Sequence, residues 1–212
     1  MIVDPIERER VARAIAALLE RELRRQNGME LDELRISGGL AGVLRSWTGT
    51  VVDGWSVSCT AQDLDDKTQG SAEDICGADI YVGISVRRPN GARKSKGFLV
   101  QSKMGPDLVR SADLVEQCEK MGKKTQAPYV WIYGDKKIEV LKGEDILGRR
   151  PYSRDPWPKR KLKDVVDAIL KCDEGDRDFG LPRGLQSGAG LRQRIRELRV
   201  PLGFALDATK RV

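Results

Sequence analysis

Apolar residues near the start of the chain recur at the spacing of one helix face. Asp4 and Pro5 have the order of a helix N-cap and a first helical residue. The periodic apolar positions that follow are Ile6, Val11, Ile15, Leu18, Leu19 and Leu23. The spacing continues to about Gln26 and stops at Asn27-Gly28. This pattern predicts a long amphipathic helix over residues 5–26.

Alternating apolar and polar residues predict strands further along the chain. Residues 55–61 alternate as in a half-buried strand, and residues 80–86 alternate with Asp79 on the polar face. Pro89-Asn90-Gly91 is a turn signal, so residues 96–103 are expected to return as the hairpin partner. One face of this second strand carries Leu99, Gln101 and Lys103, and the other carries Phe98, Val100 and Ser102.

Helical spacing returns after residue 111. Ser111 is a plausible N-cap, and Leu114, Cys118 and Met121 form an apolar stripe. Residues 128–133 are strongly apolar and 138–141 alternate, so two more strands are expected there. The predicted order up to the first of them is helix, strand, strand, strand, helix, strand, which indicates an α/β protein.

The character of the chain changes after residue 148. Residues 149–163 hold seven lysines and arginines against Asp155 alone, with Tyr152 and Trp157 among three prolines. Short helices are expected at 162–172 and 191–198. We therefore divide the chain into a core, 1–148, and a basic C-terminal extension, 149–212, which packs on the core or contacts DNA or a partner. The basic stretch itself is either a phosphate-tracking surface or a solvated linker.

Composition narrows the chemistry that is open to these 212 residues. The chain has no histidine, which excludes Ser-His-Asp and Cys-His hydrolases, histidine zinc sites and nucleases with a histidine base. Its four cysteines contain no C-x-x-C pair. The net charge of +6 fits either a polyanionic partner or a merely solubilising surface. The first residues lack the apolar stretch of a signal peptide and no apolar run reaches 18 residues, so we expect a cytoplasmic protein outside the membrane.

Polar residues lie close together at the end of the predicted hairpin that is opposite its turn. Antiparallel pairing through a turn at Asn90 brings Asp79 close to Gln101 and Lys103, and Glu73 lies in the loop just before. Carboxylate and amide oxygens are ligands that Mg²⁺ accepts, and a neighbouring lysine can orient the attacking water. Such a set is suited to phosphodiester hydrolysis without histidine.

Two short motifs resemble those of the PD-(D/E)xK restriction-endonuclease-like superfamily. They are Gly77-Ala78-Asp79-Ile80 and Leu99-Val100-Gln101-Ser102-Lys103, and they are most similar to the Mrr-type variant, in which Gly-x-Asp precedes a strand ending in Gln-x-Lys. The resemblance covers roughly residues 6–133 and implies an αβββαβ core with a mixed central sheet flanked by helices. Ala78 replaces a proline, and Gln101 replaces an acidic residue that would hold Mg²⁺ more strongly.

The resemblance also implies a site and an activity. Glu73, Asp79 and Gln101 would bind Mg²⁺, for which Mn²⁺ could substitute, Lys103 would position water, and Glu7, Glu9 or Glu20 could add a carboxylate. The implied protein is a metal-dependent endodeoxyribonuclease that cuts double-stranded DNA in restriction or anti-phage defence. Cutting both strands calls for a homodimer or larger homo-oligomer, and activation could come from a protein partner.

Simpler interpretations of the same residues remain open. Asp79 could cap a turn, Glu73 could be solvated, and Gln101 and Lys103 could be the solvent face of a strand. The alternative function is a catalytically inactive nucleic-acid-binding or assembly subunit that keeps the nuclease fold. A ribonuclease of the same fold is a third hypothesis.

Overall fold

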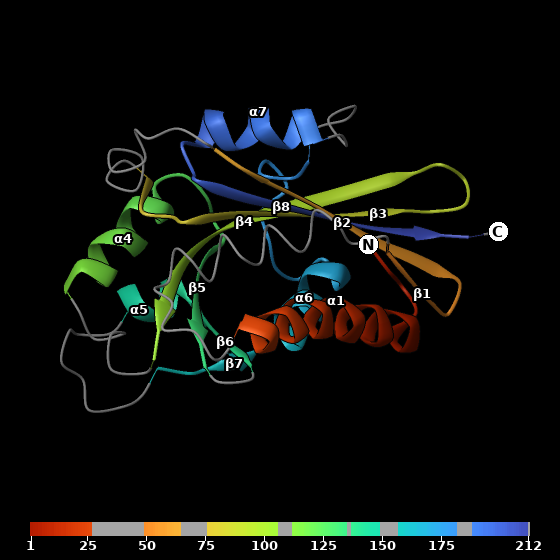
Figure 1. Ribbon diagram of the computed structural model, residues 1–212, viewed down its shortest axis with the longest axis horizontal. Coiled ribbons are helices and arrows are strands. Elements are labelled where there is room, and N and C mark those ends of the chain that lie inside the picture. Colours follow the sequence, from red (N-terminus) through yellow and green to blue (C-terminus); the bar gives the residue numbers. More distant parts are fainter. Residues whose placement is uncertain are drawn as a thin grey trace.

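A mixed eight-stranded sheet forms the centre of the computed structural model, with helices on both faces (Figure 1). The described residues are 1–26, 49–64, 76–105, 112–134, 137–148, 157–181 and 188–211. The strands are β1 (Thr50–Val52), β2 (Trp55–Asp63), β3 (Ile80–Arg87), β4 (Arg93–Met104), β5 (Pro128–Tyr133), β6 (Ile138–Lys142), β7 (Arg160–Lys161) and β8 (Leu202–Lys210). The helices are α1 (Pro5–Gln26), α4 (Ala112–Gly122), α5 (Gly143–Leu147), α6 (Leu162–Lys171) and α7 (Gly188–Leu198). The expected α/β class with a mixed, helix-flanked sheet is confirmed.

The first helix begins where the sequence predicts. The Asp4 side chain accepts a hydrogen bond from the Glu7 backbone N–H at 2.8 Å, as an N-cap does. The buried stripe of α1 starts at Val11, because Ile6 is 64% exposed. Helix α1 packs on α6, and the two cover one face of the sheet (Figure 1).

The opposite face is covered by α4, α5 and α7 (Figure 1). Leu114, Cys118 and Met121 of α4 are fully buried there, as predicted, although the expected cap Ser111 lies outside the described residues. Alternation along β4 sends Leu99 into this core and Phe98 and Val100 into the core beneath α1 and α6. The predicted division of β4 into two faces is therefore confirmed.

Strand β8 lies inside the sheet, although no pattern in the sequence predicts a strand there. The strand order is β1-β2-β8-β3-β4-β5-β6-β7, with β8 antiparallel to β2 and parallel to β3. Residues 202–210 of the expected extension thus belong to the central sheet rather than packing on it. Strand β3 is consequently buried on both faces, not on one, along Ile80–Val86.

The elements that the motifs need occur in the expected order, α1, β2, β3, β4, α4, β5, with the short strand β1 in addition between α1 and β2. Strands β3 and β4 form the predicted antiparallel hairpin, and β5 runs parallel to β4 after the α4 crossover. No helix in the described part of the chain has the length and apolar content needed to cross a membrane.

Glu174 joins the segment after α6 to the far edge of the sheet. Its carboxylate accepts hydrogen bonds from the Tyr129 hydroxyl at 2.8 Å and from Arg160 at 2.6 and 2.8 Å, and Lys142 lies 3.1 Å away. Burial disfavours the charged form, but the hydrogen bonds from Tyr129, Arg160 and Lys142 outweigh it and lower the pKa of Glu174 below its ordinary 4.5.

Replacing this carboxylate should cost stability in a pH-dependent way. We expect Glu174→Gln to lower the free energy of unfolding at neutral pH by about 2 kcal/mol, because charge-assisted hydrogen bonds are lost. A lowered folded-state pKa contributes stability above pH 4.5 that disappears as pH falls through that pKa, so the difference from wild type should shrink in acid. Urea denaturation at neutral pH and at about pH 3 measures both values.

Glu144→Gln is the matched control. Glu144 also lies 3.2 Å from Lys142, but its side chain is 69% exposed, so its loss should change the unfolding free energy by less than about 1 kcal/mol. A Glu174→Gln loss that is equally large at both pH values would contradict the assigned cause.

Candidate metal and phosphodiester site

The turn before β3 is set by Gly77. Its φ of +71° lies in the left-handed region, and a Cβ there would come within 2.4 Å of the Gln117 carbonyl oxygen in α4. Glycine therefore lets the turn pack directly against the helix. After this turn the Asp79 N–H donates to the Val100 carbonyl at 2.9 Å, which fixes the backbone of Asp79 against β4.

The Asp79 carboxylate is buried, with 4% of the residue exposed, and one of its oxygens accepts three hydrogen bonds. The donors are the Gln101 side-chain amide at 2.7 Å, the Ser102 N–H at 2.7 Å and the Ser102 hydroxyl at 2.5 Å. The β3–β4 ladder begins at Ile80, opposite Val100. The Ser102 N–H lies beyond that pair, so a side-chain oxygen replaces the missing backbone acceptor.

Lys103 is half-buried and follows Gln101 on the face that α4 covers. Burial raises the pKa of the Cys118 thiol to about 12, and the positive charge of Lys103 acts in the opposite direction. Leu99 lies in the core beneath α4, and parity along β4 puts Lys103 on the same face as Leu99. The structure thus brings Asp79, Gln101 and Lys103 to one end of the sheet, as the hairpin register predicts.

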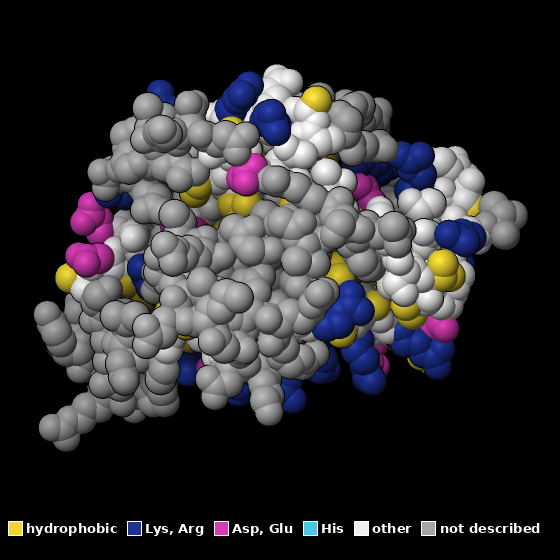
Figure 2. Space-filling view, viewed as in Figure 1, with side chains coloured by type: hydrophobic (Ala, Val, Ile, Leu, Met, Phe, Trp, Pro, Cys, Tyr) yellow, Lys and Arg dark blue, Asp and Glu magenta, His cyan; other side chains and the backbone are white. Residues whose placement is uncertain are grey.

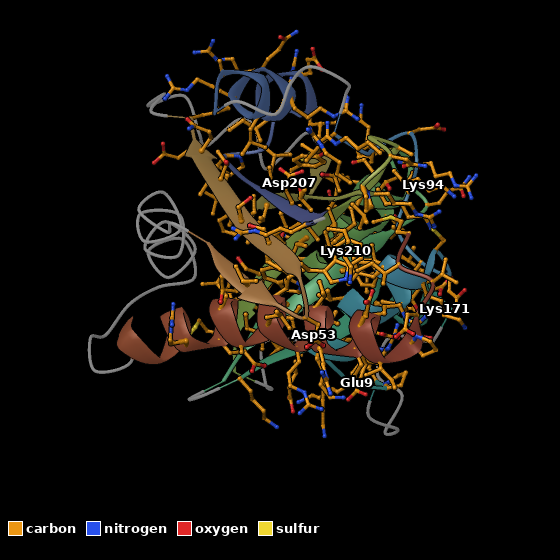
Figure 3. The ribbon with its side chains drawn as sticks, turned by 90° about the vertical axis from the view of Figure 1, so that its right-hand side faces the viewer. Glu9, Asp53, Lys94, Lys171, Asp207 and Lys210 are labelled. Carbon is orange, nitrogen blue, oxygen red and sulfur yellow. The ribbon has the colours of Figure 1, made fainter. Side chains whose placement is uncertain are left out.

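The other predicted carboxylates are not part of this group. Glu73 lies outside the described residues. Glu7 accepts hydrogen bonds from Trp55 at 2.9 Å and Lys210 at 2.5 Å. Ile80, which follows Asp79, is level with Leu202 of β8, and Lys210 is eight residues further along that strand. At 3.3 Å per residue this is a distance of about 26 Å, so Glu7, which is bound to Lys210, cannot reach Asp79. In Figure 3, Lys210 lies at the end of the sheet that faces the viewer.

The two remaining glutamates of α1 differ from each other. Glu9 is exposed and pairs with Arg13 at 2.7 Å. Glu20 accepts a weak hydrogen bond from the Ile138 N–H at 3.4 Å. Ile138 is opposite Tyr133, which is level with Met104, so Glu20 lies at the Lys103 end of the sheet but against the α1 face. Lys103 points to the α4 face.

The described residues could hold a hard divalent cation only if water molecules completed its coordination shell. No group of three histidine, cysteine, aspartate or glutamate side chains that could hold a metal occurs among the described residues. One carboxylate, Asp79, and one amide oxygen, Gln101, suit Mg²⁺, which keeps several waters. The Gln101 amide presents its nitrogen to Asp79, so ligation through its oxygen requires the amide to turn.

Two polar residues of this corner were not predicted as site residues. Parity along β4 assigns Ser102 to the opposite face, and nothing in the sequence signals its bonds to Asp79. Gln117 lies between the buried positions Leu114 and Cys118 on α4, and a polar residue at that position was the signal in the sequence that could have identified it. Its side-chain oxygen is buried and has no hydrogen-bond partner among the described residues, and such an acceptor is a costly group that a donor or a cation would stabilise.

The basic stretch is described only from Trp157 onward, so Tyr152 and the arginines at 149, 150 and 154 lie outside the described residues. Trp157 packs against the core beneath α4, α5 and α7, which favours an anchoring role over stacking on bases.

Comparisons with known proteins identify no relative of this chain. No protein-family model, curated protein or solved structure matches this chain. What the site can do therefore follows from its residues and their geometry.

Proposed function

We propose that this protein is a metal-dependent endonuclease that hydrolyses phosphodiester bonds of double-stranded DNA. The observation that carries the proposal is the buried 2.7 Å contact between Asp79 and Gln101, with Lys103 next on the same face of β4. A carboxylate, an amide and an ammonium at the open end of a mixed sheet form the minimal set for this chemistry. The absence of histidine agrees with a site of this composition.

Each side chain has a distinct part in the proposed reaction. Asp79 and Gln101 would hold Mg²⁺ or Mn²⁺, and Glu73 is the proposed second carboxylate. When bound, the cation lowers the pKa of a coordinated water and offsets charge on the phosphate. Lys103, which is half-buried, orients the attacking water and contacts a phosphate oxygen.

A restriction-endonuclease-like core is part of the proposal. The order α1, β2, β3, β4, α4, β5 supports it, and β8 between β2 and β3 is an addition to that core. A homodimer or larger assembly, activation by a protein partner, a cytoplasmic location and a role in restriction or anti-phage defence complete the proposed picture.

The test is nicking of supercoiled plasmid with Mg²⁺, Mn²⁺ or EDTA. Wild type should nick in either metal and not in EDTA. Lys103→Ala should reduce the rate at least a hundredfold, because an aligned acid–base or positioning group contributes on that order. Lys171→Ala, which removes a lysine paired with Asp173 far from the site, should leave the rate unchanged. Absence of metal-dependent cleavage of any DNA or RNA would contradict the proposal.

A second candidate has its own observation. One Asp79 oxygen is occupied by three bonds that close the end of the β3–β4 ladder, which is also what a purely structural cap would do. In that case the protein is an inactive nucleic-acid-binding or assembly subunit. It would bind a duplex without cutting it, and metal would not change its affinity.

A further inference from the structure

A groove of about 390 Å³ lies between α1 and the β6–β7 edge of the sheet. Its wall on the α1 side includes Ala16 and Ala17, and small side chains leave the space open. Its cations are Arg13, Lys137, Lys159, Arg160, Lys161 and Lys163, and its carboxylates are Glu20 and Glu139. We call this the edge groove. Its lining carries a net positive charge of four.

Ion pairs with carboxylates outside the lining offset part of this charge, because Arg13 pairs with Glu9 and Lys163 pairs with Asp164. Lys137 and Lys159 both lie 2.7 Å from the one carboxylate of Glu139, so a positive charge remains on that group. Arg160 is held by Glu174. Lys161 is exposed and has no ion-pair partner in the described part of the chain. Dark-blue lysine and arginine side chains also follow the lower margin of Figure 2, on the side where α1 lies in Figure 1.

The strand register connects the edge groove to the candidate site. Lys103 is level with Ile132, Ile132 is opposite Glu139, and Glu139 is opposite Lys161. Lys161 is therefore level with Lys103 across the sheet, whereas Arg13, Ala16 and Glu20 place the groove itself on the α1 side. Three strand spacings of about 4.8 Å separate the two lysines by roughly 14 Å.

We propose that the edge groove binds the sugar–phosphate backbone of duplex DNA on the α1 side of the sheet edge. The identification of the polyanion as duplex DNA rests on the proposed function, whereas the groove and its charge do not. Cations that track phosphates position a duplex without reading its sequence. Binding should therefore depend on salt and hardly on sequence.

The experiment measures binding of a fluorescent duplex of about 20 base pairs by anisotropy across a salt series, with EDTA present so that no cleavage occurs. The groove variant is K159Q/K161Q, and the Lys161 side chain makes no capping bond to α6. Two lost phosphate contacts should lower the slope of log Kd against log salt by about 1.8 and weaken binding at 0.1 M salt at least tenfold.

The matched control is K94Q/K171Q. It removes the same charge at Lys94 and Lys171, which Figure 3 labels and neither of which lines the edge groove. It should bind like wild type. Circular dichroism and thermal unfolding verify that both double variants are folded.

The outcomes separate this inference from the proposed function. Groove-dependent binding without any metal-dependent cleavage supports the edge groove and rejects the nuclease. Cleavage by wild type with equal affinity and equal salt slope in both double variants overturns the edge groove and leaves the nuclease standing. No duplex binding by wild type, or groove-dependent binding of polyglutamate instead of the duplex, also overturns it.

Discussion

Asp79→Asn is expected to abolish plasmid cleavage while the protein stays folded. Asparagine fills the same volume, and its side-chain oxygen can still accept the Ser102 N–H bond, now 2.7 Å long. It has no negative charge to hold a divalent cation. Loss of about 4 kcal/mol of transition-state stabilisation corresponds to a rate reduction of about a thousandfold. Nicking assays at saturating Mg²⁺ give the rate, and urea denaturation gives the stability.

Asp79→Ala separates the catalytic role from the structural one. Alanine removes the acceptor of three hydrogen bonds, and the Ser102 N–H and the Gln101 amide are buried. Leaving such donors unpaired should cost about 3 kcal/mol of unfolding free energy in addition to the loss of cleavage. A cleaving Asp79→Asn protein would contradict the metal role, and a fully stable Asp79→Ala protein would contradict the capping role.

Asp53→Asn is the control for both substitutions. Asp53 pairs with the exposed Arg10 at 2.7 Å and lies at the opposite end of the sheet, where Figure 3 labels it. Cleavage should be unchanged, and the unfolding free energy should fall by less than about 1 kcal/mol.

Gly77→Ala should be among the most destabilising single substitutions in the chain. The added methyl group would meet the Gln117 carbonyl oxygen at 2.4 Å and its Cα at 2.9 Å, both backbone atoms that cannot rotate away. The left-handed φ of +71° adds its own strain for alanine. We expect a loss of about 3 kcal/mol or more, which for a chain of this size lowers Tm by about 6–12 °C. Differential scanning calorimetry measures the shift.

Gly91→Ala isolates the backbone contribution. Gly91 has a similar φ of +78°, but no atom of the described part of the chain lies within 4 Å of an added Cβ. Its cost should be the left-handed strain alone, about 1 kcal/mol, or about 2–4 °C in Tm. Equal Tm losses for the two variants would show that the contact with α4 contributes nothing.

Local patterns predicted the elements that have one dominant apolar face. The α1 stripe, its Asp4 cap, the β3–β4 hairpin and the buried residues of α4 all follow from spacing over a few residues. Strand β8 was not predicted, because Leu202–Leu206 is buried on both faces and has no alternation to detect. Its partners β2 and β3 are more than a hundred residues away in the chain.

The candidate site divides in the same way. Hairpin register and parity were sufficient to bring Asp79 near Gln101 and to put Lys103 on the same face. Parity directs the Ser102 side chain to the other face. The Ser102 N–H donates to Asp79 only because the β3–β4 ladder ends before it and leaves it without a backbone acceptor on β3. Exclusion of Glu7 depends on its contacts with Trp55 and Lys210, which no local pattern reveals.

The sequence by itself determined the chemistry that is available: no imidazole, a Gly-x-Asp turn and a Gln-x-Lys strand end in one hairpin. Such features are local, because backbone geometry sets which side chains share a face. Only the tertiary structure decided that Asp79 also caps β4, that β8 completes the sheet, and that Lys161 falls in the same row as Lys103. Those relations depend on hydrogen bonds between strands distant in the chain, which form only when the whole sheet assembles.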